Sequence, residues 1–340
     1  MIEVKNLYKR YGNNTAVKNA SFTIKEGEIV GFLGPNGAGK STIMNILTGY
    51  LSLTSGSASI AGLNVLDYPE QVKKRIGYLP EQPPLYLDMT VREYLEFVYD
   101  LKKAKFQKKP HLDEICRLVN ITNVENRLIK NLSKGYRQRV GIAQALIGNP
   151  DVLILDEPTV GLDPKQIIEI RSLIAKLGRH HTIILSSHIL SEIQAVCKRI
   201  IIINRGEIVA DDLAENLSKS MTTDHSVTVR VQGPEESVIK LLSSIKEVES
   251  VTSLGIVESG SIDLLVEPVK DADIRRAIFE RLAERKWPIL ELSTKQLTLE
   301  QIFLRLTEGV SYTNDESPKS TISDNSKKTA RKLVYGEEEK

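Results

Sequence analysis

Nine consecutive residues have the types and the spacing of a loop that binds phosphate groups. They are Gly34, Pro35, Asn36, Gly37, Ala38, Gly39, Lys40, Ser41 and Thr42. The glycines allow backbone amides to curl around phosphate oxygens, and the start of a following helix adds positive potential. Lys40 has the length to reach the β and γ phosphates, and the Ser41 hydroxyl can ligate Mg²⁺. A plain glycine-rich turn is the alternative, which the presence of every demanding residue of the pattern disfavours.

Two adjacent carboxylates, Asp156 and Glu157, directly follow the apolar run 152–155. A buried strand that ends in acidic residues places charge at the carboxyl edge of a sheet, where ligands bind in open α/β folds. Beside a phosphate loop, Asp156 would hold the Mg²⁺ shell and Glu157 would polarise the attacking water. An acidic turn would be the better interpretation of the pair alone. Together with the phosphate loop, the pair predicts hydrolysis of a nucleotide.

Both motifs need a scaffold that brings them to one edge, and the apolar pattern supplies it. Continuous apolar runs rich in β-branched residues, separated by segments with helical spacing, indicate a parallel sheet covered by helices. These runs cover residues 28–33, 75–79, 152–155, 182–185 and 200–203. The sequence therefore predicts an α/β nucleotide-binding domain over residues 1–212. A helical insert at about 83–131 interrupts the sheet, and one of its helices opens at Thr90 and Glu93, which have capping-box spacing.

The pattern changes after about residue 212. Strands and helices are predicted in the order β-α-β-β-α-β, which is the ferredoxin-like arrangement. Their expected bounds are 226–231, 234–245, 248–254, 261–266, 271–284 and 288–292. We therefore expect a linker at 213–225 and a small α+β accessory domain at 226–310. An amphipathic segment at 297–307 is expected to dock on one of the domains, and residues 311–340 read as a disordered tail.

Composition limits the partners. The 340 residues carry 46 Lys and Arg against 44 Asp and Glu, and this balance argues against the broad basic face of a nucleic-acid-binding protein. Two cysteines and the absence of a signal-like start predict a reducing, cytoplasmic environment. The uncharged stretch 41–66 is long enough to span a bilayer but is rich in Ser, Thr, Gly and Asn. If the protein acts at a membrane, we expect another chain to supply the span.

A further motif identifies a family. Residues 132–138, Leu-Ser-Lys-Gly-Tyr-Arg-Gln, lie upstream of the acidic pair and resemble the signature sequence of ABC transporter ATPases. The resemblance continues in order through four further sites, which are Tyr11, Gln82, Gly161-Leu-Asp163-Pro and Ser186-Ser-His188. By this resemblance, residues 1–212 are identified as a P-loop NTPase domain of the ABC type.

The resemblance implies roles around the nucleotide. Tyr11 would stack on adenine, residues 34–42 would wrap the phosphates of ATP, and His188 would contact the γ-phosphate beside the base Glu157. The implied Mg²⁺ ligands are Ser41, Gln82 and Asp156.

The resemblance also implies a head-to-tail dimer with two ATP molecules sandwiched, formed either as a homodimer or with a second ATPase subunit. In the family the signature of one protomer closes on the nucleotide held by the other, so by resemblance Ser133 and Gly135 would act on the nucleotide of the partner. The Ser133 hydroxyl and the Gly135 amide would form a second anion-binding helix start there. Asp163 would lie at the dimer interface. Lys134 and Tyr136 stand where the more common signature has Gly and Gln, whereas Ser133 and Gly135 are kept.

Similar signatures occur in bacterial subunits that power exporters of drugs, antibiotics, lipids and polysaccharides, and the ending 297–307 resembles that subgroup, including subunits associated with gliding motility. A transmembrane permease would dock near Gln82, Tyr86 and the Thr90 helix, placing the chain on the cytoplasmic face of the membrane. The alternative is a soluble ABC ATPase that acts on ribosomes, DNA or iron-sulfur assembly. A nucleotide sensor without turnover is disfavoured by Glu157.

Overall fold

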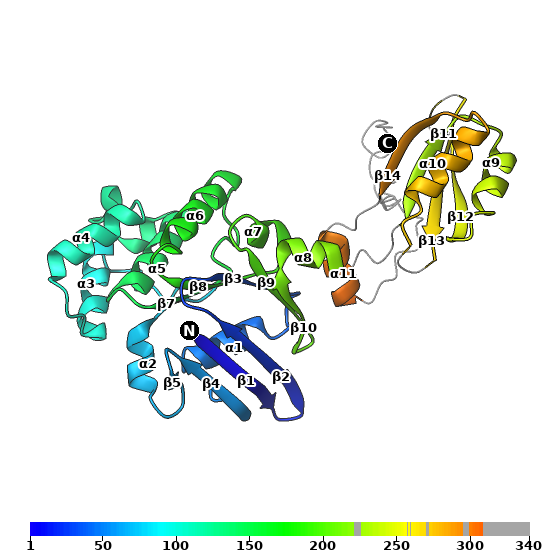
Figure 1. The fold of residues 1–340 in the computed structure, drawn as a ribbon. Helices are drawn as coiled ribbons and strands as arrows, with labels where there is room; N and C mark the ends of the chain where they lie inside the picture. Colours follow the sequence, from blue (N-terminus) through cyan, green and yellow to red (C-terminus); the bar gives the residue numbers. More distant parts are fainter. Residues whose placement is uncertain (221–225, 257, 259, 270–271, 295–298, 309–340) are drawn as a thin grey trace, which may run out of the picture.

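The computed structural model describes residues 1–220, 226–256, 258, 260–269, 272–294 and 299–308 (Figure 1). These residues build three sheets. Two of them share the first region, residues 1–213, and the third forms the second region, residues 227–294. No described helix is long and apolar enough to cross a membrane.

The central sheet of the first region has six strands in the order β10-β9-β3-β8-β7-β6. Its strands are β3 (Ile29–Leu33), β6 (Ile76–Leu79), β7 (Val152–Asp156), β8 (Thr182–Ser187), β9 (Arg199–Asn204) and β10 (Glu207–Leu213). Five of them run parallel, as predicted, and β10 pairs antiparallel with β9 at the edge. Because parallel strands end together, the carboxyl ends of β3, β7 and β8 meet at one edge.

Both faces of this sheet are covered, which explains the continuous apolar runs. Alternate residues of each strand enter different cores: Leu153 packs with one face and Ile154 with the other. One core lies under the helices α5 (Lys134–Leu146), α6 (Pro164–Leu177) and α7 (Leu190–Gln194). The other surrounds the helix α1 (Lys40–Leu47), which follows the phosphate loop as expected.

A second, antiparallel sheet of the first region was not predicted. Its order is β2-β1-β4-β5, with β1 (Ile2–Tyr11), β2 (Asn14–Ile24), β4 (Ser55–Ile60) and β5 (Leu63–Asn64). Register shifts in the pairing of β1 with β2 break the alternation of buried and exposed residues that marks a strand. Together with the central sheet, this sheet encloses α1, whose Ile43, Met44, Ile46 and Leu47 are all buried.

The expected helical insert is present between β6 and β7. It consists of α3 (Val91–Lys102), α4 (Lys108–Leu118) and two short turns of 3₁₀ helix, Thr122–Val124 and Ile129–Asn131, and leads into α5. The predicted capping box opens α3, where the Glu93 carboxylate accepts the Thr90 N–H at 2.8 Å and the Thr90 hydroxyl accepts the Glu93 N–H at 3.3 Å. A seven-residue helix, α2 (Pro69–Arg75), precedes the insert.

The second region has the expected element order β-α-β-β-α-β. Its elements are β11 (Val227–Val231), α9 (Glu235–Leu242), β12 (Val248–Gly255), β13 (Ile262–Pro268), α10 (Arg275–Glu284) and β14 (Ile289–Thr294). The four strands form an antiparallel sheet in the order β12-β13-β11-β14, packed on α9 and α10. α10 begins at Arg275, whereas its predicted start was residue 271, which lies outside the described residues. The Asp273 carboxylate accepts the Arg275 N–H at 3.2 Å where the helix begins.

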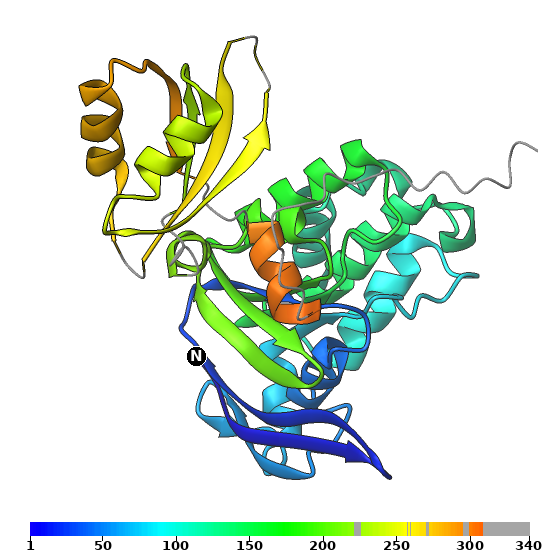
Figure 2. The ribbon, with the colours of Figure 1, turned by 90° about the vertical axis from the view of Figure 1, so that its right-hand side faces the viewer.

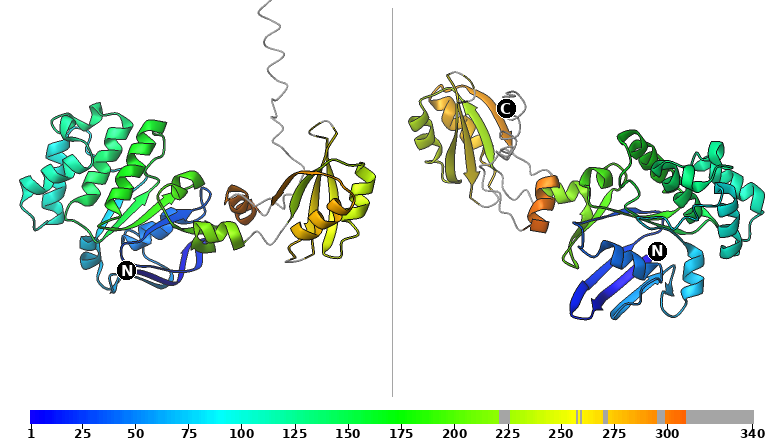
Figure 3. Two further views of the ribbon diagram at one scale, coloured as in Figure 1. Left: turned by 45° about the horizontal axis from the view of Figure 1, so that its top comes forward. Right: turned by 180° about the vertical axis from the view of Figure 1, so that it is seen from behind.

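The predicted linker 213–225 is not wholly a linker, because α8 (Ala214–Ser220) lies within it. The predicted amphipathic segment 297–307 corresponds to α11 (Leu299–Glu308), which packs on the first region against α8 and β9. Figure 2 shows this helix in orange beside the green strands of the sheet edge, and Figure 3 shows it next to α8. Ile302 is fully buried there, and the Asn204 amide donates to the carbonyls of Leu306 and Thr307. The predicted disordered tail, 311–340, lies outside the described residues.

Candidate functional site

The phosphate loop connects β3 to α1, as its motif requires. Gly39 is the residue before the helix and has φ 111°, a conformation that side chains rarely adopt. A Cβ on Gly34 would lie 2.3 Å from the carbonyl oxygen of Ile203, so the loop can pass this close to β9 only with glycine there. The buried Lys40 ammonium donates to the carbonyl of Gly34 at 2.7 Å, within its own loop.

The acidic pair is held by a serine from the neighbouring strand. Ser186, on β8, donates its hydroxyl hydrogen to the Asp156 carboxylate, and its oxygen accepts the Glu157 N–H at 2.9 Å. Glu157 has φ 49°, which is unusual for a residue other than glycine and marks a sharp turn at the end of β7. One hydroxyl therefore fixes both carboxylate residues at the sheet edge.

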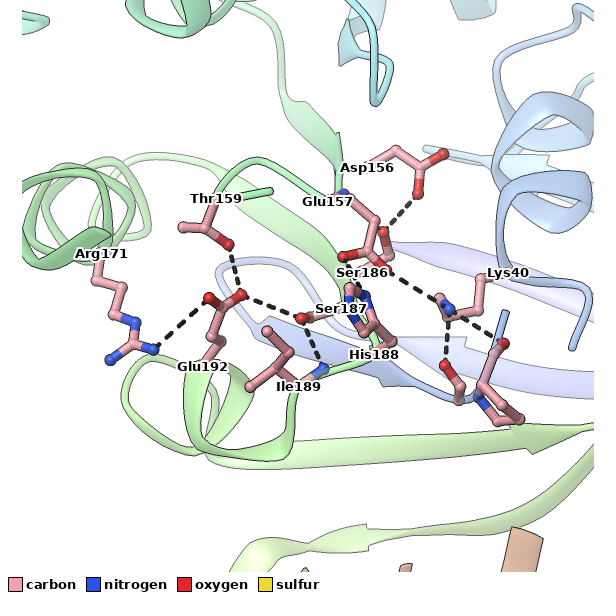
Figure 4. Close-up of polar contacts among 12 residues, drawn as sticks. Lys40, Asp156, Glu157, Thr159, Arg171, Ser186, Ser187, His188, Ile189 and Glu192 are labelled. Carbon is pink, nitrogen blue, oxygen red and sulfur yellow. Dashed lines mark hydrogen bonds and ion pairs between the residues drawn. The ribbon is translucent and has the colours of Figure 1, made fainter. Parts of the chain in front are cut away.

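Glu157 lies between a lysine and a histidine (Figure 4). Its Oε2 is 2.9 Å from His188 Nδ1, and its Oε1 is 3.6 Å from Lys40 Nζ. Oε1 is buried and has no hydrogen-bond partner, which is rare for a carboxylate oxygen. This oxygen therefore keeps its capacity to accept a hydrogen bond, and the Lys40 ammonium is the cation that faces it.

A cavity of about 440 Å³ contains these groups together with the phosphate loop. Its lining holds Ala16, Asn36, Gly37, Ala38, Gly39, Lys40, Ser41, Thr42, Glu81, Glu157, Val160 and His188. Most of the residues expected to touch the phosphates are therefore brought into one space with the expected base and the expected γ-phosphate sensor.

The three expected Mg²⁺ ligands line a second cavity, of about 750 Å³, which shares Ser41 with the phosphate-loop cavity. Ser41, Gln82 and Asp156 all line it, and they offer a hydroxyl, an amide and a carboxylate oxygen, the donor types that Mg²⁺ prefers. Tyr78 lines the same cavity. Burial raises the pKa of its hydroxyl, and the charge of Asp156 adds to this effect, so the hydroxyl keeps its proton and bonds the Asn45 side chain at 3.1 Å.

The signature residues lie elsewhere. Ser133 caps α5, where its hydroxyl accepts the Tyr136 N–H at 3.4 Å, and Asp163 caps α6, where it accepts the Gln166 N–H at 2.9 Å. Gly135 and Asp163 line a third cavity, of about 530 Å³, and no phosphate-loop residue is part of its lining. Within one chain the signature is thus not brought to the phosphate loop.

Tyr11 is also not in the phosphate-loop cavity. It ends β1 with 45% of its surface exposed, and the Lys9 ammonium lies 5.0 Å from its ring centre. The residue of the β1-β2 hairpin that lines the phosphate-loop cavity is Ala16, on β2.

Sequence reasoning missed two groups of site residues. Ser186 was named only as part of the motif Ser186-Ser-His188, and its bonds to Asp156 and Glu157 were not predicted. The two serines before His188 were the signal that could have indicated this role. Nothing in the sequence pattern indicated Ala16 or Val160, because tertiary packing alone brings them to the cavity.

Comparisons with known proteins identify the family. The family model for ABC transporters matches residues 17–160. The uncharacterised ABC transporter ATP-binding protein YhcH of Bacillus subtilis is 34% identical, over 90% of this chain and 96% of that protein. The linearmycin resistance ATP-binding protein LnrL of Bacillus subtilis is 30% identical, over 90% of this chain and 98% of that protein. The bacitracin transport ATP-binding protein BcrA of Bacillus licheniformis is 39% identical, over 64% of this chain and 72% of that protein.

Solved structures agree with the sequence comparisons. A dimeric bacterial ABC transporter cassette superposes with a TM-score of 0.58 at 30% identity, covering 63% of this chain and 98% of that one. A dimeric post-hydrolysis state of the same cassette, bound to ADP and Pi, gives a TM-score of 0.58 at 29% identity over the same shares.

Proposed function

This chain belongs to the family of ABC transporter ATP-binding proteins, and we propose that its ATP hydrolysis drives the export of antibiotics through a separate transmembrane permease. The observation that carries the catalytic part is the Glu157 carboxylate between Lys40 and His188, with one oxygen unpaired, in the phosphate-loop cavity. We also propose that residues 1–212 act as the ATPase domain and residues 226–310 as an accessory domain.

The phosphate loop binds ATP in this proposal. Lys40 already lies in the cavity with its charge turned to the Gly34 carbonyl, so a phosphate oxygen can replace that carbonyl with a stronger, charged acceptor. The amides at the start of α1 add positive potential toward the same phosphates. Mg²⁺ held by Ser41, Gln82 and Asp156 would neutralise charge on the β and γ phosphates.

Glu157 then acts as the general base. Its free Oε1 accepts a proton from water, while Oε2 stays bonded to His188, which keeps the carboxylate oriented and lies next to the expected γ-phosphate position. Lys40 at 3.6 Å stabilises the ionised carboxylate before ATP binds.

The nucleotide site is completed by a second copy. Ser133 and Gly135 form a helix start that no phosphate in their own chain occupies, because the phosphate-loop cavity is a separate space. In a head-to-tail dimer, this helix start would bind the γ-phosphate held by the partner, with Asp163 at the interface and Tyr11 against the adenine. The relatives' names concern linearmycin resistance and bacitracin transport rather than gliding motility, and they favour antibiotic export from the cytoplasmic face of the membrane.

The dimer can be tested with Ser133→Arg. A bulky cation at the N-cap of α5 is expected to block closure while ATP still binds the monomer, because the phosphate loop is untouched. Size-exclusion chromatography with light scattering, in the presence of MgATP, compares this variant with the unmodified chain. If Ser133→Arg still dimerises with ATP, the arrangement in which the signature acts on the partner's nucleotide is wrong.

The transport part has its own test. Deleting the gene that encodes this chain is expected to increase sensitivity to linearmycin or bacitracin, and Glu157→Gln expressed in its place should not restore resistance. Unchanged sensitivity to both antibiotics would contradict the proposed cargo while leaving the ATPase assignment intact.

A further inference from the structure

A buried carboxylate outside the residues expected to touch ATP joins two loops of the site. Glu192 belongs to the short helix α7 and is 5% exposed. Its Oε2 accepts hydrogen bonds from the hydroxyls of Thr159 and Ser187, the latter at 3.1 Å (Figure 4). One carboxylate oxygen thus bonds Thr159, which follows β7, and Ser187, which is the last residue of β8.

Each hydroxyl lies next to a proposed catalytic group. Thr159 is two residues after Glu157 and opens the turn that leads to Asp163. Ser187 immediately precedes His188, and its oxygen also accepts the Ile189 N–H at 3.0 Å, which fixes the turn that carries the histidine. Glu192 therefore links the segment that follows Glu157 to the residue that precedes His188.

The two hydroxyls are the main partners of this charge. A buried carboxylate is costly unless it is paired and hydrogen-bonded. Arg171 is the one cation with a recorded contact to it among the described residues, at 3.9 Å, which is beyond hydrogen-bond distance. The bonds from Thr159 and Ser187 are consequently charge-assisted, a class stronger than bonds between neutral groups.

The segment from Glu157 to Asp163 is a chain of tight turns. The Val160 N–H donates to the Glu157 carbonyl at 3.2 Å, and the Leu162 N–H donates to the Thr159 carbonyl at 3.2 Å. These two bonds tie the backbone from Glu157 to Leu162 into consecutive turns, and Asp163 is the next residue in the chain.

We propose that Glu192 is a positioning residue that, through Thr159 and Ser187, couples the loop formed by residues 157–163, here called the Asp163 loop, to His188. When a second copy closes on the loop, the carboxylate carries that contact to the turn that holds His188 against Glu157. This inference rests on the proposed dimeric ATPase and adds the route by which closure reaches the reacting groups.

A matched pair of variants at Thr159 tests the route. Thr159→Val keeps the shape and removes the hydroxyl, whereas Thr159→Ser keeps the hydroxyl. Loss of a hydrogen bond to a charged group that matters only in the closed state should lower kcat by about tenfold or more. We expect this for Thr159→Val, with unchanged binding of ATP to the monomer and a loss of cooperativity in ATP concentration. Thr159→Ser should retain both kcat and cooperativity.

The shared carboxylate gives a second, independent measurement. In a Glu192→Ala background, Thr159→Val should cause no further loss of kcat, because the bond that it removes is already gone. Ser187→Ala should reproduce the Thr159→Val loss and supplies the measurement if Thr159→Val does not fold. Thermal unfolding of each variant separates lost stability from lost turnover.

Two results would overturn the inference. One is a folded Thr159→Val with the kcat and cooperativity of the unmodified chain, and the other is an equal additional loss in the Glu192→Ala background. Failure of the proposed dimeric ATPase, on which the inference rests, looks different, because the unmodified chain itself would then neither hydrolyse ATP nor dimerise with it.

Discussion

The two regions of this molecule each bury a carboxylate beside a cation, and they treat it differently. In the second region, Asp263 receives two hydrogen bonds from Arg230, at 2.7 and 2.8 Å, across the paired strands β11 and β13. In the first region, Glu157 has one oxygen without a hydrogen-bond partner and a lysine at 3.6 Å.

This is the difference that we expect between a structural ion pair and the catalytic carboxylate that we propose. A bidentate pair on facing residues of a sheet satisfies both charges and fixes the strand register. A buried carboxylate left partly unpaired costs stability, and such a cost persists where the free atom takes part in function. Among the described residues, the two buried side-chain atoms without partners both belong to the first region, on Glu157 and Arg171.

The largest expected effect comes from Glu157→Gln. The amide cannot take a proton from water, so kcat for ATP hydrolysis should fall by about the 10²- to 10⁴-fold typical of losing a general base. ATP binding should persist, because Lys40 and the phosphate loop are unchanged. Steady-state ATPase rates at saturating MgATP, with binding of a fluorescent ATP analogue, measure both. Turnover equal to that of the unmodified chain would remove Glu157 from the role of base.

Asp263→Asn probes the other carboxylate and should act on stability alone. The hydrogen bonds from Arg230 hold the pKa of Asp263 below its ordinary value of 3.8. The stabilisation that they provide is therefore present above that value and is lost as the pH falls through the lower pKa of the folded state. Thermal unfolding near neutral pH should show the second region melting a few degrees lower in the variant, and the difference should vanish in strong acid.

ATP hydrolysis by Asp263→Asn should match that of the unmodified chain. A large loss of turnover, with the first region still folded, would show that the two carboxylates are not separable in the way that their geometry indicates.

The last prediction concerns the alkylation of the two cysteines, which should be very slow in the folded protein. Both cysteines of the chain, Cys116 and Cys197, lie in the first region, and burial raises the pKa of each thiol to about 12. Near pH 8 their thiolate fraction should be about 10³-fold below that of an ordinary thiol, so alkylation of the native protein should be very slow. The denatured chain is the control and should label at both sites.

The same labelling sharpens the comparison. In Asp263→Asn, the two cysteines should stay as slow to react as in the unmodified chain, because the weakened region does not contain them. Fast labelling of the native variant would mean that loosening the second region also opens the first.

Features formed by neighbouring residues could be predicted from the sequence, whereas features formed by residues far apart in the chain could not. The phosphate loop and the pair Asp156-Glu157 were predicted in place because each is a short run whose chemistry and flanking strand are written side by side. The sheet that contains β1 and β4 was not predicted. Bulges break the alternation of buried and exposed residues along β1, and β4 has the sequence Ser-Gly-Ser-Ala-Ser-Ile, which lacks the apolar residues typical of a strand. Glu192 gave no signal, because only the fold brings it to Thr159 and Ser187.

The position of α11 has a consequence for the order in which the protein is made. Leu299 and Ile302 of this helix bury themselves against the first region together with Leu217 of α8, although all of residues 226–294 lie between the two helices in the chain. During synthesis, domains generally fold as units from the N-terminus. Here a nascent chain that has emerged only as far as β14 still exposes the apolar surface that α11 will cover. The first region therefore completes its apolar core only after α11 has been synthesised.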